Sequence, residues 1–192
     1  MMGKQGSFIK RLTDIIFSTL ILILTSPVLL ITAIAIKIES RGPVFFVQER
    51  TGLNGKPFRM IKFRGMVVNA LEIGPELTQE NDPRITKVGK FLRRTSIDEI
   101  PNFINVLRGE MSLVGPRPEI TSITSKYNDF EKKVFEFKPG VTGISQIRGR
   151  QKLTPAERVK MEIDYYKQPT IWSDFLIILT TFKIVWSNEG NI

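Results

Sequence analysis

The sequence predicts an α+β protein in which a long apolar helix precedes a small mixed globular domain. The first observation behind this prediction is that no charged side chain interrupts the stretch from Ile15 to Ile36. The second is that strand-like and helix-like patterns both occur after residue 41, as is typical of mixed folds. The chain has 192 residues, enough for one compact domain plus an appendage. We therefore expect a membrane segment over residues 1–40 and a globular domain over residues 41–192.

Composition narrows the chemistry before any motif is considered. The chain contains no cysteine and no histidine, which excludes disulfides, thiolate nucleophiles, ordinary zinc sites and every triad that uses histidine. Catalysis would have to use carboxylates, Lys, Arg, Tyr or Ser, and a metal ion would be a hard one such as Mg²⁺. The formal net charge of +9 favours anionic partners, namely nucleic acid, acidic lipid headgroups or phosphorylated small molecules.

The apolar stretch Ile15–Ile36 would reach roughly 33 Å as a straight helix, about the thickness of a bilayer core. Pro27 lies in its middle and removes the backbone hydrogen bond to the Ile23 carbonyl. The Ser26 hydroxyl can bond a carbonyl one turn back, so the Ser26-Pro27 pair predicts a kink. Positive side chains flank both ends and give no orientation: Lys4, Lys10 and Arg11 before, and Lys37, Arg41 and Arg50 after. From the residues alone, a spanning helix and a re-entrant helix are equally supported.

The chain after the apolar stretch begins with a predicted hairpin. Val44–Gln48 and Phe58–Arg64 are β-rich runs joined through Asn54-Gly55, a strong turn signal. The polar segment Asn69–Asp82 is predicted to be a loop. Glu99–Arg108 has apolar residues at helical spacing and is closed by Gly109, which predicts a helix.

Two further helices are predicted near the C-terminus. Thr154, Pro155 and Glu157 form the signature of a capping box with proline in the first turn, which predicts a helix to about Lys167. The apolar stretch Ile171–Trp186 is interrupted by Asp174 and Lys183 and has a tryptophan near each end. It suits an amphipathic helix at a membrane interface, and a core-packed helix is the alternative.

Asp98 and Glu99 form the carboxylate pair with the greatest chemical interest. Asp98 stands where the N-cap of the helix Glu99–Arg108 belongs, so capping alone would explain it. A carboxylate at a helix N-terminus is also held ionised, and the same terminus attracts phosphate. An ionised Asp98 facing a phosphate could act as a nucleophile that forms an acyl-phosphate, with Glu99 helping to hold Mg²⁺.

Basic residues surround this pair in the sequence. The segment Arg84–Arg94 is rich in Lys and Arg and has no acid, so it forms a solvated face, a lipid-contacting face, or in part a phosphate site. Lys62 and Arg64 in the strand Phe58–Arg64 are further candidates. Two prolines fix the backbone around Arg117 in Gly115-Pro116-Arg117-Pro118 and suit its guanidinium to bidentate phosphate contact. A proline-stiffened turn with an exposed arginine is the alternative.

A glycine-rich segment follows from Lys138 to Arg150. Its glycines allow close backbone approach, and Gln146 and Arg150 could contact a sugar or a nucleotide. A plain glycine-rich turn is the simpler interpretation of this segment taken alone.

Together these motifs resemble the bacterial sugar transferases known as monotopic phosphoglycosyl transferases. The resemblance runs from Ser26-Pro27 through KFRGM at residues 62–66 to the stretch from Asp82 to Glu119, which contains RRTSIDE and VGPRP. It continues in KPGVTGISQIRGR at residues 138–150 and in Asp164-Tyr165-Tyr166. It covers nearly the whole chain, and RRTSIDE and VGPRP are specific to the family.

The resemblance implies an enzyme that moves a sugar 1-phosphate from a UDP-sugar to undecaprenyl phosphate and releases UMP. It implies Asp98 as the nucleophile and Glu99 as its partner at Mg²⁺. Lys62, Arg93 and Arg117 match phosphate-site or basic active-site positions. It also implies that the apolar segment is a re-entrant helix broken at Ser26-Pro27. The domain would then lie on the cytoplasmic face of the bacterial inner membrane, in contact with membrane lipids and with no nucleic acid partner.

Three positions depart from the family pattern: Gly65 stands for a common serine, Asn102 for a glutamine, and Arg148 for an asparagine. The departure at Arg148 leaves the sugar undetermined, and the sequence also leaves the glycan pathway and the oligomeric state open. Two other functions compete with the transferase. One is a non-catalytic basic module that binds anionic lipid or nucleic acid, and the other is a phosphatase that acts on lipid diphosphates through the same aspartate.

Overall fold

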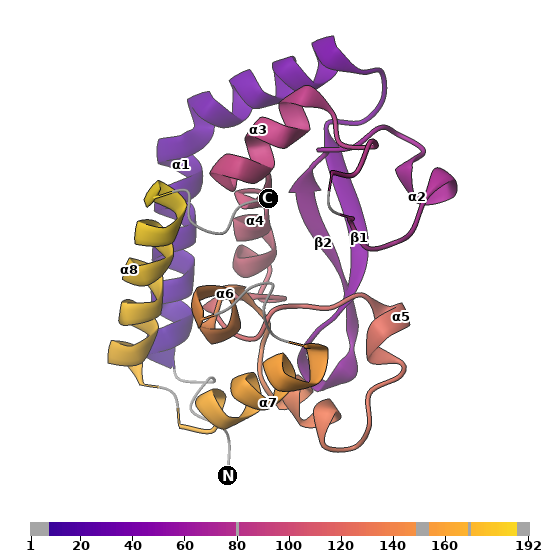
Figure 1. Ribbon diagram of the computed structural model, residues 1–192. Coiled ribbons are helices and arrows are strands. Elements are labelled where there is room, and N and C mark those ends of the chain that lie inside the picture. Colours follow the sequence, from indigo (N-terminus) through magenta and orange to yellow (C-terminus); the bar gives the residue numbers. More distant parts are fainter. Residues whose placement is uncertain (1–7, 80, 149–153, 169, 188–192) are drawn as a thin grey trace.

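The computed structural model describes residues 8–79, 81–148, 154–168 and 170–187. Helices and strands follow one another in a mixed order, which confirms the α+β class (Figure 1). The helices are α1 (Phe8–Glu39), α2 (Ala70–Ile73), α3 (Lys87–Thr95), α4 (Asn102–Leu107), α5 (Thr121–Thr124), α6 (Ile144–Arg148), α7 (Pro155–Tyr166) and α8 (Ile171–Ser187). The strands are β1 (Phe45–Thr51), β2 (Pro57–Phe63), β3 (Ser112–Val114) and β4 (Gly140–Thr142), and short 3₁₀ turns occur at η2 (Leu53–Gly55), η3 (Ile97–Glu99) and η4 (Glu131–Glu136).

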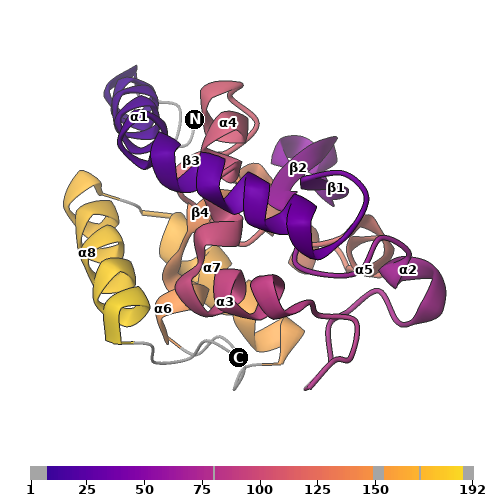
Figure 2. The same cartoon turned by 90° about the horizontal axis from the view of Figure 1, so that it is seen from above.

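Helix α1 is continuous through Pro27, but its ribbon changes direction partway along (Figures 1 and 2). The Ser26 hydroxyl donates a hydrogen bond to the Ile23 carbonyl at 2.8 Å. That carbonyl is the one that the proline leaves without its helical donor. The structure therefore confirms the prediction that the Ser26 hydroxyl replaces the backbone hydrogen bond that Pro27 removes.

Helix α1 buries mostly polar side chains and exposes apolar ones, the opposite of a surface helix in a soluble protein. Polar residues make up three of its four buried positions: Asp14, Ser18 and Thr32, with Ile36 as the fourth. Its apolar side chains point outward, and Phe8, Leu24 and Ile38 are each more than three-quarters exposed. Within the described residues, α1 is the one helix long and apolar enough to cross a membrane. An apolar exterior of this size indicates membrane association.

Both halves of α1 pack against the same globular domain. In the N-terminal half, the Arg11 guanidinium donates to the carbonyls of Val106 and Leu107 at the end of α4, at 2.6 and 2.8 Å. At the other end, the Glu39 carboxylate accepts the backbone N–H groups of Lys87 and Val88 at the start of α3. The two ends of α1 are thus fixed to the helices on either side of residues 96–101.

Strands β1 and β2 form the predicted antiparallel hairpin, with Phe45 opposite Phe63 and Thr51 opposite Pro57. Asn54 (φ 56°) and Gly55 (φ 72°) supply the left-handed backbone of the turn, which confirms the hairpin signal. The predicted loop Asn69–Asp82 holds one helical turn, α2, that the sequence did not predict.

Arg84 has a structural role that differs from the basic face expected for Arg84–Arg94. Its side chain is buried and forms an ion pair with Asp82 at 2.6 Å. It also donates to the carbonyls of Ala70 and Pro75, both at 2.7 Å. Arg84 therefore closes the loop before α3 and belongs neither to a solvated face nor to a phosphate site.

A second small sheet pairs β3 with β4 in parallel. Glycine is required here, because a Cβ on Gly140 would lie 2.1 Å from the backbone nitrogen of Gly115. The glycine-rich segment was expected to allow a close approach of the backbone, and at Gly140 the group that approaches is the backbone of Gly115. Beneath this sheet, Tyr166 and Ile177 pack with Leu113, Val114 and Ile144 in a buried cluster.

The two C-terminal helices form as predicted. Thr154 and Glu157 make the reciprocal capping box at the start of α7. Helix α8 lies beside the N-terminal half of α1 (Figures 1 and 2), where Lys10 and Asp174 form an ion pair. Ile177 of α8 is buried, whereas Trp172, Phe175 and Phe182 are exposed. The helix thus has one face on the core and one apolar face directed outward.

Candidate active site

Asp98 lies in the tight connection between α3 and α4. Ser96 ends α3 in the left-handed conformation (φ 57°) and turns the chain into the 3₁₀ turn η3, which contains Asp98 and Glu99. The alternative explanation that Asp98 caps the following helix is excluded, because the N-cap residue of α4 is Pro101. After the left-handed Ser96, the chain makes a separate 3₁₀ turn, η3, before α4 begins at Asn102. Asp98 lies inside that turn and not at the start of α4.

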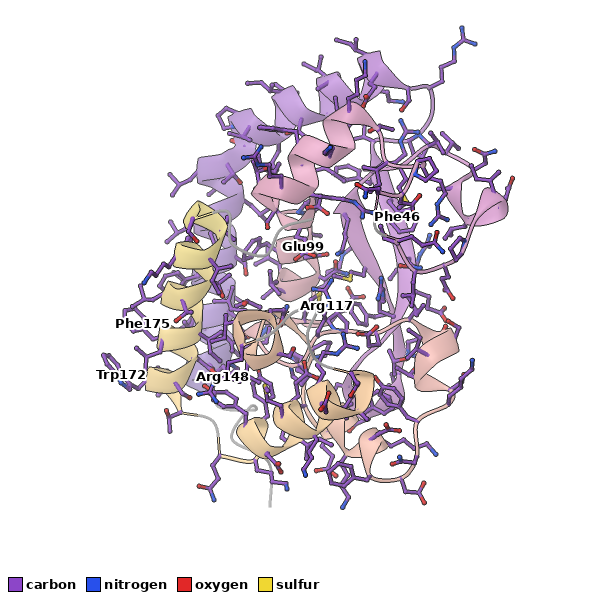
Figure 3. The ribbon with its side chains drawn as sticks, in the orientation of Figure 1. Phe46, Glu99, Arg117, Arg148, Trp172 and Phe175 are labelled. Carbon is purple, nitrogen blue, oxygen red and sulfur yellow. The ribbon has the colours of Figure 1, made fainter. Side chains whose placement is uncertain are left out.

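Glu99 is held by cations from two other segments. Lys62 of β2 donates to the Glu99 carboxylate at 2.7 Å, and the Arg117 guanidinium lies 3.8 Å from the same oxygen. Figure 3 shows Glu99 and Arg117 in the middle of the molecule, between α4 and the β1–β2 hairpin. Residues far apart in the sequence therefore meet beside Asp98.

Burial raises the pKa of Asp98 to about 6, and the neighbouring negative charge of Glu99 adds to the effect. The charges of Lys62, Arg93 and Arg117 act in the opposite direction and favour the ionised carboxylate. The same five residues that the sequence nominated for phosphate chemistry thus interact electrostatically in the folded protein. An aspartate with such a pKa in a cationic setting is a candidate functional group.

Arg93 reaches this group from α3, and its position depends on a close contact of two glycines. A Cβ on Gly89 would lie 2.0 Å from the Gly65 carbonyl oxygen, so α3 can pack on the end of β2 only with glycine there. The Arg93 guanidinium donates to the Thr78 hydroxyl at 3.2 Å. Arg93 therefore links the 66–86 connection to the site.

Arg117 is fixed by its backbone as well as by the prolines beside it. Pro116 and Pro118 have no N–H group, and the single backbone donor between them, Arg117 N–H, bonds the Glu162 carboxylate at 3.0 Å. Arg64 follows strand β2 and was also a candidate for phosphate binding, but it is not part of the site. It is buried and donates to the carbonyls of Ser40 and Arg41 after α1.

Gln146 lines a small pocket together with Lys62, Glu99 and Arg117. Its side-chain nitrogen donates to the Val141 carbonyl at 3.1 Å, whereas its side-chain oxygen is buried without a hydrogen-bond partner. An unpaired buried acceptor beside a polar pocket is suited to bind a ligand donor.

The two remaining predictions in this segment have different outcomes. Arg150 lies outside the described residues. Arg148 is exposed, and Figure 3 places it on the α8 side of α6, apart from Glu99 and Arg117.

Two features of this region escaped sequence reasoning. Arg50 lines the same pocket as Gln146, but in the sequence it was only one of the charges that flank the apolar stretch. The side chain of Asn102 is fully buried, and neither of its polar atoms has a hydrogen-bond partner. The alternation of β1, which places Gln48 and Arg50 on one face, is the signal that could have found Arg50.

The residues present fit a Mg²⁺ site that is completed by a substrate. Asp98 and Glu99 are adjacent carboxylates, the ligand type that Mg²⁺ prefers, and protein Mg²⁺ sites often use one or two carboxylates plus phosphate oxygens. In the described part of the chain no cluster of three or more potential metal-ligating Asp, Glu, His or Cys residues occurs. A phosphate-bearing ligand would have to supply the rest of the coordination.

Comparison with known proteins gives a consistent result. The sequence model of the family described as "Bacterial sugar transferase" matches residues 5–188. A UDP-glucose:undecaprenyl-phosphate glucose-1-phosphate transferase of Escherichia coli is 46% identical over 186 residues, covering 91% of this chain and 40% of that protein. A protein of the same name from Caulobacter vibrioides is 41% identical over 192 residues, covering 94% of this chain and 71% of that protein.

A third relative acts on a different sugar by its name. The UDP-N-acetylgalactosamine-undecaprenyl-phosphate N-acetylgalactosaminephosphotransferase of Aeromonas hydrophila is 39% identical over 191 residues, covering 96% of this chain and 45% of that protein. The chain thus spans less than half the length of the Escherichia coli and Aeromonas relatives.

Proposed function

Since the chain belongs to the bacterial sugar transferase family, we propose that it transfers a sugar 1-phosphate from a UDP-sugar to undecaprenyl phosphate and releases UMP. The names of its relatives support this substrate pair, and they differ in the sugar. The observation that carries the proposal is the position of Asp98, which lies beside Glu99 and among the charges of Lys62, Arg93 and Arg117.

In the first step, an oxygen of the ionised Asp98 carboxylate attacks the β-phosphorus of the UDP-sugar, the one that bears the sugar. A bond forms between Asp98 and this phosphorus, and the bond to the bridging oxygen breaks. UMP leaves with that oxygen and both bonding electrons. The product on the protein is an acyl-phosphate that carries the sugar.

In the second step, a phosphate oxygen of undecaprenyl phosphate attacks the same phosphorus. The bond to Asp98 breaks, its carboxylate is regenerated, and the sugar is left on a lipid-linked diphosphate. Both nucleophiles are ionised near neutral pH, so neither step needs a histidine-like base. This requirement agrees with the absence of histidine from the chain.

Asp98 and Glu99 would hold Mg²⁺, which when bound offsets the negative charge of the diphosphate. Lys62 and Arg117 add fixed positive charge at the Glu99 carboxylate. Such preorganised cations stabilise charge that develops on phosphate oxygens during transfer.

We also propose that α1 is re-entrant and that the domain faces the cytoplasm at the inner membrane. The Ser26 bond to Ile23 supports a permanent bend, and the contacts of Arg11 and Glu39 tie both ends of α1 to one domain. A helix that crossed the bilayer would have its ends on opposite faces. The exposed apolar side of α8 would lie in the interface of the same leaflet.

The central experiment uses Asp98→Asn, with Asp129→Asn as a control because Asp129 is fully exposed. UMP release and labelling of the protein by a radiolabelled UDP-sugar should be lost in Asp98→Asn and kept in the control. Persistent UMP release by Asp98→Asn would contradict the mechanism. Transfer of the labelled sugar phosphate to water in place of undecaprenyl phosphate would identify a phosphatase.

The sugar and the topology need separate measurements. A panel of UDP-sugars, scored by UMP release with undecaprenyl phosphate present, identifies the donor. Tags placed at the two ends of the chain should both be accessible from the cytoplasmic face. Labelling of the two tags from opposite faces would exclude a re-entrant α1.

A further inference from the structure

Arg50 is a partly buried cation that has no ion-pair partner among the described residues. Its guanidinium donates to the Pro118 carbonyl at 3.2 Å and to the Gln48 side-chain oxygen at 2.7 Å. Both acceptors are uncharged, and the Arg50 Nε group is buried without any partner. Among the residues that the structure describes, no carboxylate forms an ion pair with Arg50 within 4.0 Å.

Two other arginines near this region, Arg64 and Arg84, are more deeply buried than Arg50. Arg84 forms an ion pair with Asp82 at 2.6 Å. Arg64 donates to the carbonyls of Ser40 and Arg41 just after α1, at the negative end of the helix dipole. A partly buried cation without an ion-pair partner costs free energy. Arg64 likewise lacks a carboxylate partner within the described part of the chain and has an unpartnered Nε, but it lies outside the pocket that Arg50 lines.

Burial and the nearby positive charge of Arg117 lower the pKa of Arg50 to about 10, although the carboxylates of Glu119, Glu99 and Glu76 act in the opposite direction. Arg50 and Arg117 therefore repel one another, although they line the same pocket. The pocket also contains Lys62 and a single carboxylate, Glu99. Three cations facing one carboxylate leave an excess of positive charge that an anion would balance.

We propose that Arg50 and Arg117 form an anion-binding subsite that holds a phosphate group of the substrate. The two guanidinium groups reach the pocket from β1 and from the Pro116–Pro118 segment, and a phosphate between them would satisfy unused N–H donors of both. Guanidinium groups bind phosphate through paired hydrogen bonds. The identity of the phosphate rests on the proposed function, whereas the need for an anion rests on the charges of the pocket.

The first test measures binding of inorganic pyrophosphate to the full chain by calorimetry, without turnover. We expect Arg50→Gln to weaken binding about tenfold or more, and Arg50→Lys to weaken it less because the charge is kept. Arg59→Gln is the matched control, since Arg59 lies on the neighbouring strand β2 and is exposed. Unchanged binding by a folded Arg50→Gln, or no binding by the unaltered protein at millimolar pyrophosphate, would overturn the proposal.

The second test identifies which phosphate occupies the subsite. A higher KM for the UDP-sugar alone in Arg50→Lys assigns the donor diphosphate, and a higher KM for undecaprenyl phosphate alone assigns the acceptor. If KM changes for neither substrate, the subsite is not used in turnover and the proposal fails. If the unaltered protein binds pyrophosphate through Arg50 but releases no UMP from any UDP-sugar, the proposed function fails and the subsite stands.

Discussion

The Glu162 carboxylate joins the two segments that carry Arg117 and Gln146. One of its oxygens accepts the backbone N–H of Arg117 at 3.0 Å and the Ser145 hydroxyl at 2.5 Å. Glu162 is only 2% exposed, and burial raises its pKa. A buried carboxylate with two donors from different segments acts as a fixed junction between the walls of the site.

Removing this junction should impair the site more than the fold. We expect Glu162→Ala to lower kcat/KM about tenfold or more, because the Arg117 segment loses its one side-chain anchor between two prolines. Glu162→Gln should recover most of the loss, since its amide oxygen can accept the same two hydrogen bonds. Steady-state kinetics of the two variants measure the effect, and Asp164→Ala, an exposed change on the same helix, is the control. Equal kinetic losses in Glu162→Ala and Glu162→Gln would argue against the positioning role.

The pKa of Asp98 predicts a pH dependence of the first chemical step. Attack requires the ionised carboxylate, and the pKa is raised to about 6. At limiting Mg²⁺, the rate of protein labelling by the UDP-sugar should therefore rise with pH between about 5 and 7 and then level off. Limiting Mg²⁺ is needed because a bound cation would itself lower the pKa of Asp98. Rapid-quench measurement of the labelling step tests this prediction, and a rate that is constant over this range would show that Asp98 ionises at a lower pH.

The same pKa predicts that Asp98 weakens the fold at neutral pH. Because the folded-state pKa lies above the usual value, folding favours the protonated form. The stabilisation from Asp98 is thus complete below about pH 4 and is lost as the pH rises through about 6. We expect Asp98→Asn to be more stable than the unaltered protein at pH 7.5, by on the order of 2 kcal/mol, with little difference at pH 4.5. Chemical unfolding at both pH values, with Asp129→Asn as control, measures the difference.

The contact of Gly89 with Gly65 predicts an asymmetric response to alanine. A Cβ on Gly89 would lie 2.0 Å from backbone oxygen, whereas a Cβ on Gly65 would meet its nearest neighbour at 3.4 Å. We expect Gly89→Ala to lower the free energy of unfolding by roughly 1–3 kcal/mol and to reduce activity by displacing Arg93. Gly65→Ala should be tolerated. Melting temperatures of the pair test the prediction, and equal tolerance of both changes would contradict the packing.

Local signals predicted much of this structure. The Asn54-Gly55 turn, the Thr154–Glu157 capping box and the Ser26-Pro27 exchange each depend on residues within one turn of one another. Such features can be read from a few neighbouring residues. Sequence patterns predicted the helices α1, α4, α7 and α8 and the β1–β2 hairpin, whereas α2, α3, α5 and α6 were not predicted.

The roles of Arg50, Arg84 and Glu162 could not be predicted in this way. Arg50 and Glu162 act through partners at Pro118 and Arg117, which are distant in the sequence. In the sequence Arg84 is one of several cations in a basic segment, whereas in the structure it is buried and forms an ion pair with Asp82. The position of Asp98 was misjudged because a left-handed residue that is not glycine, Ser96, gives no signal in the sequence.

The polar inner side of α1 means that α1 cannot be removed without damage to the globular domain. Shortening the chain to make it water-soluble would remove Arg11 from the end of α4 and Glu39 from the start of α3. It would also uncover Phe63 and Leu92, which pack against Ile36. The helices on both sides of Asp98 would lose support together, so solubilisation should keep α1 whole.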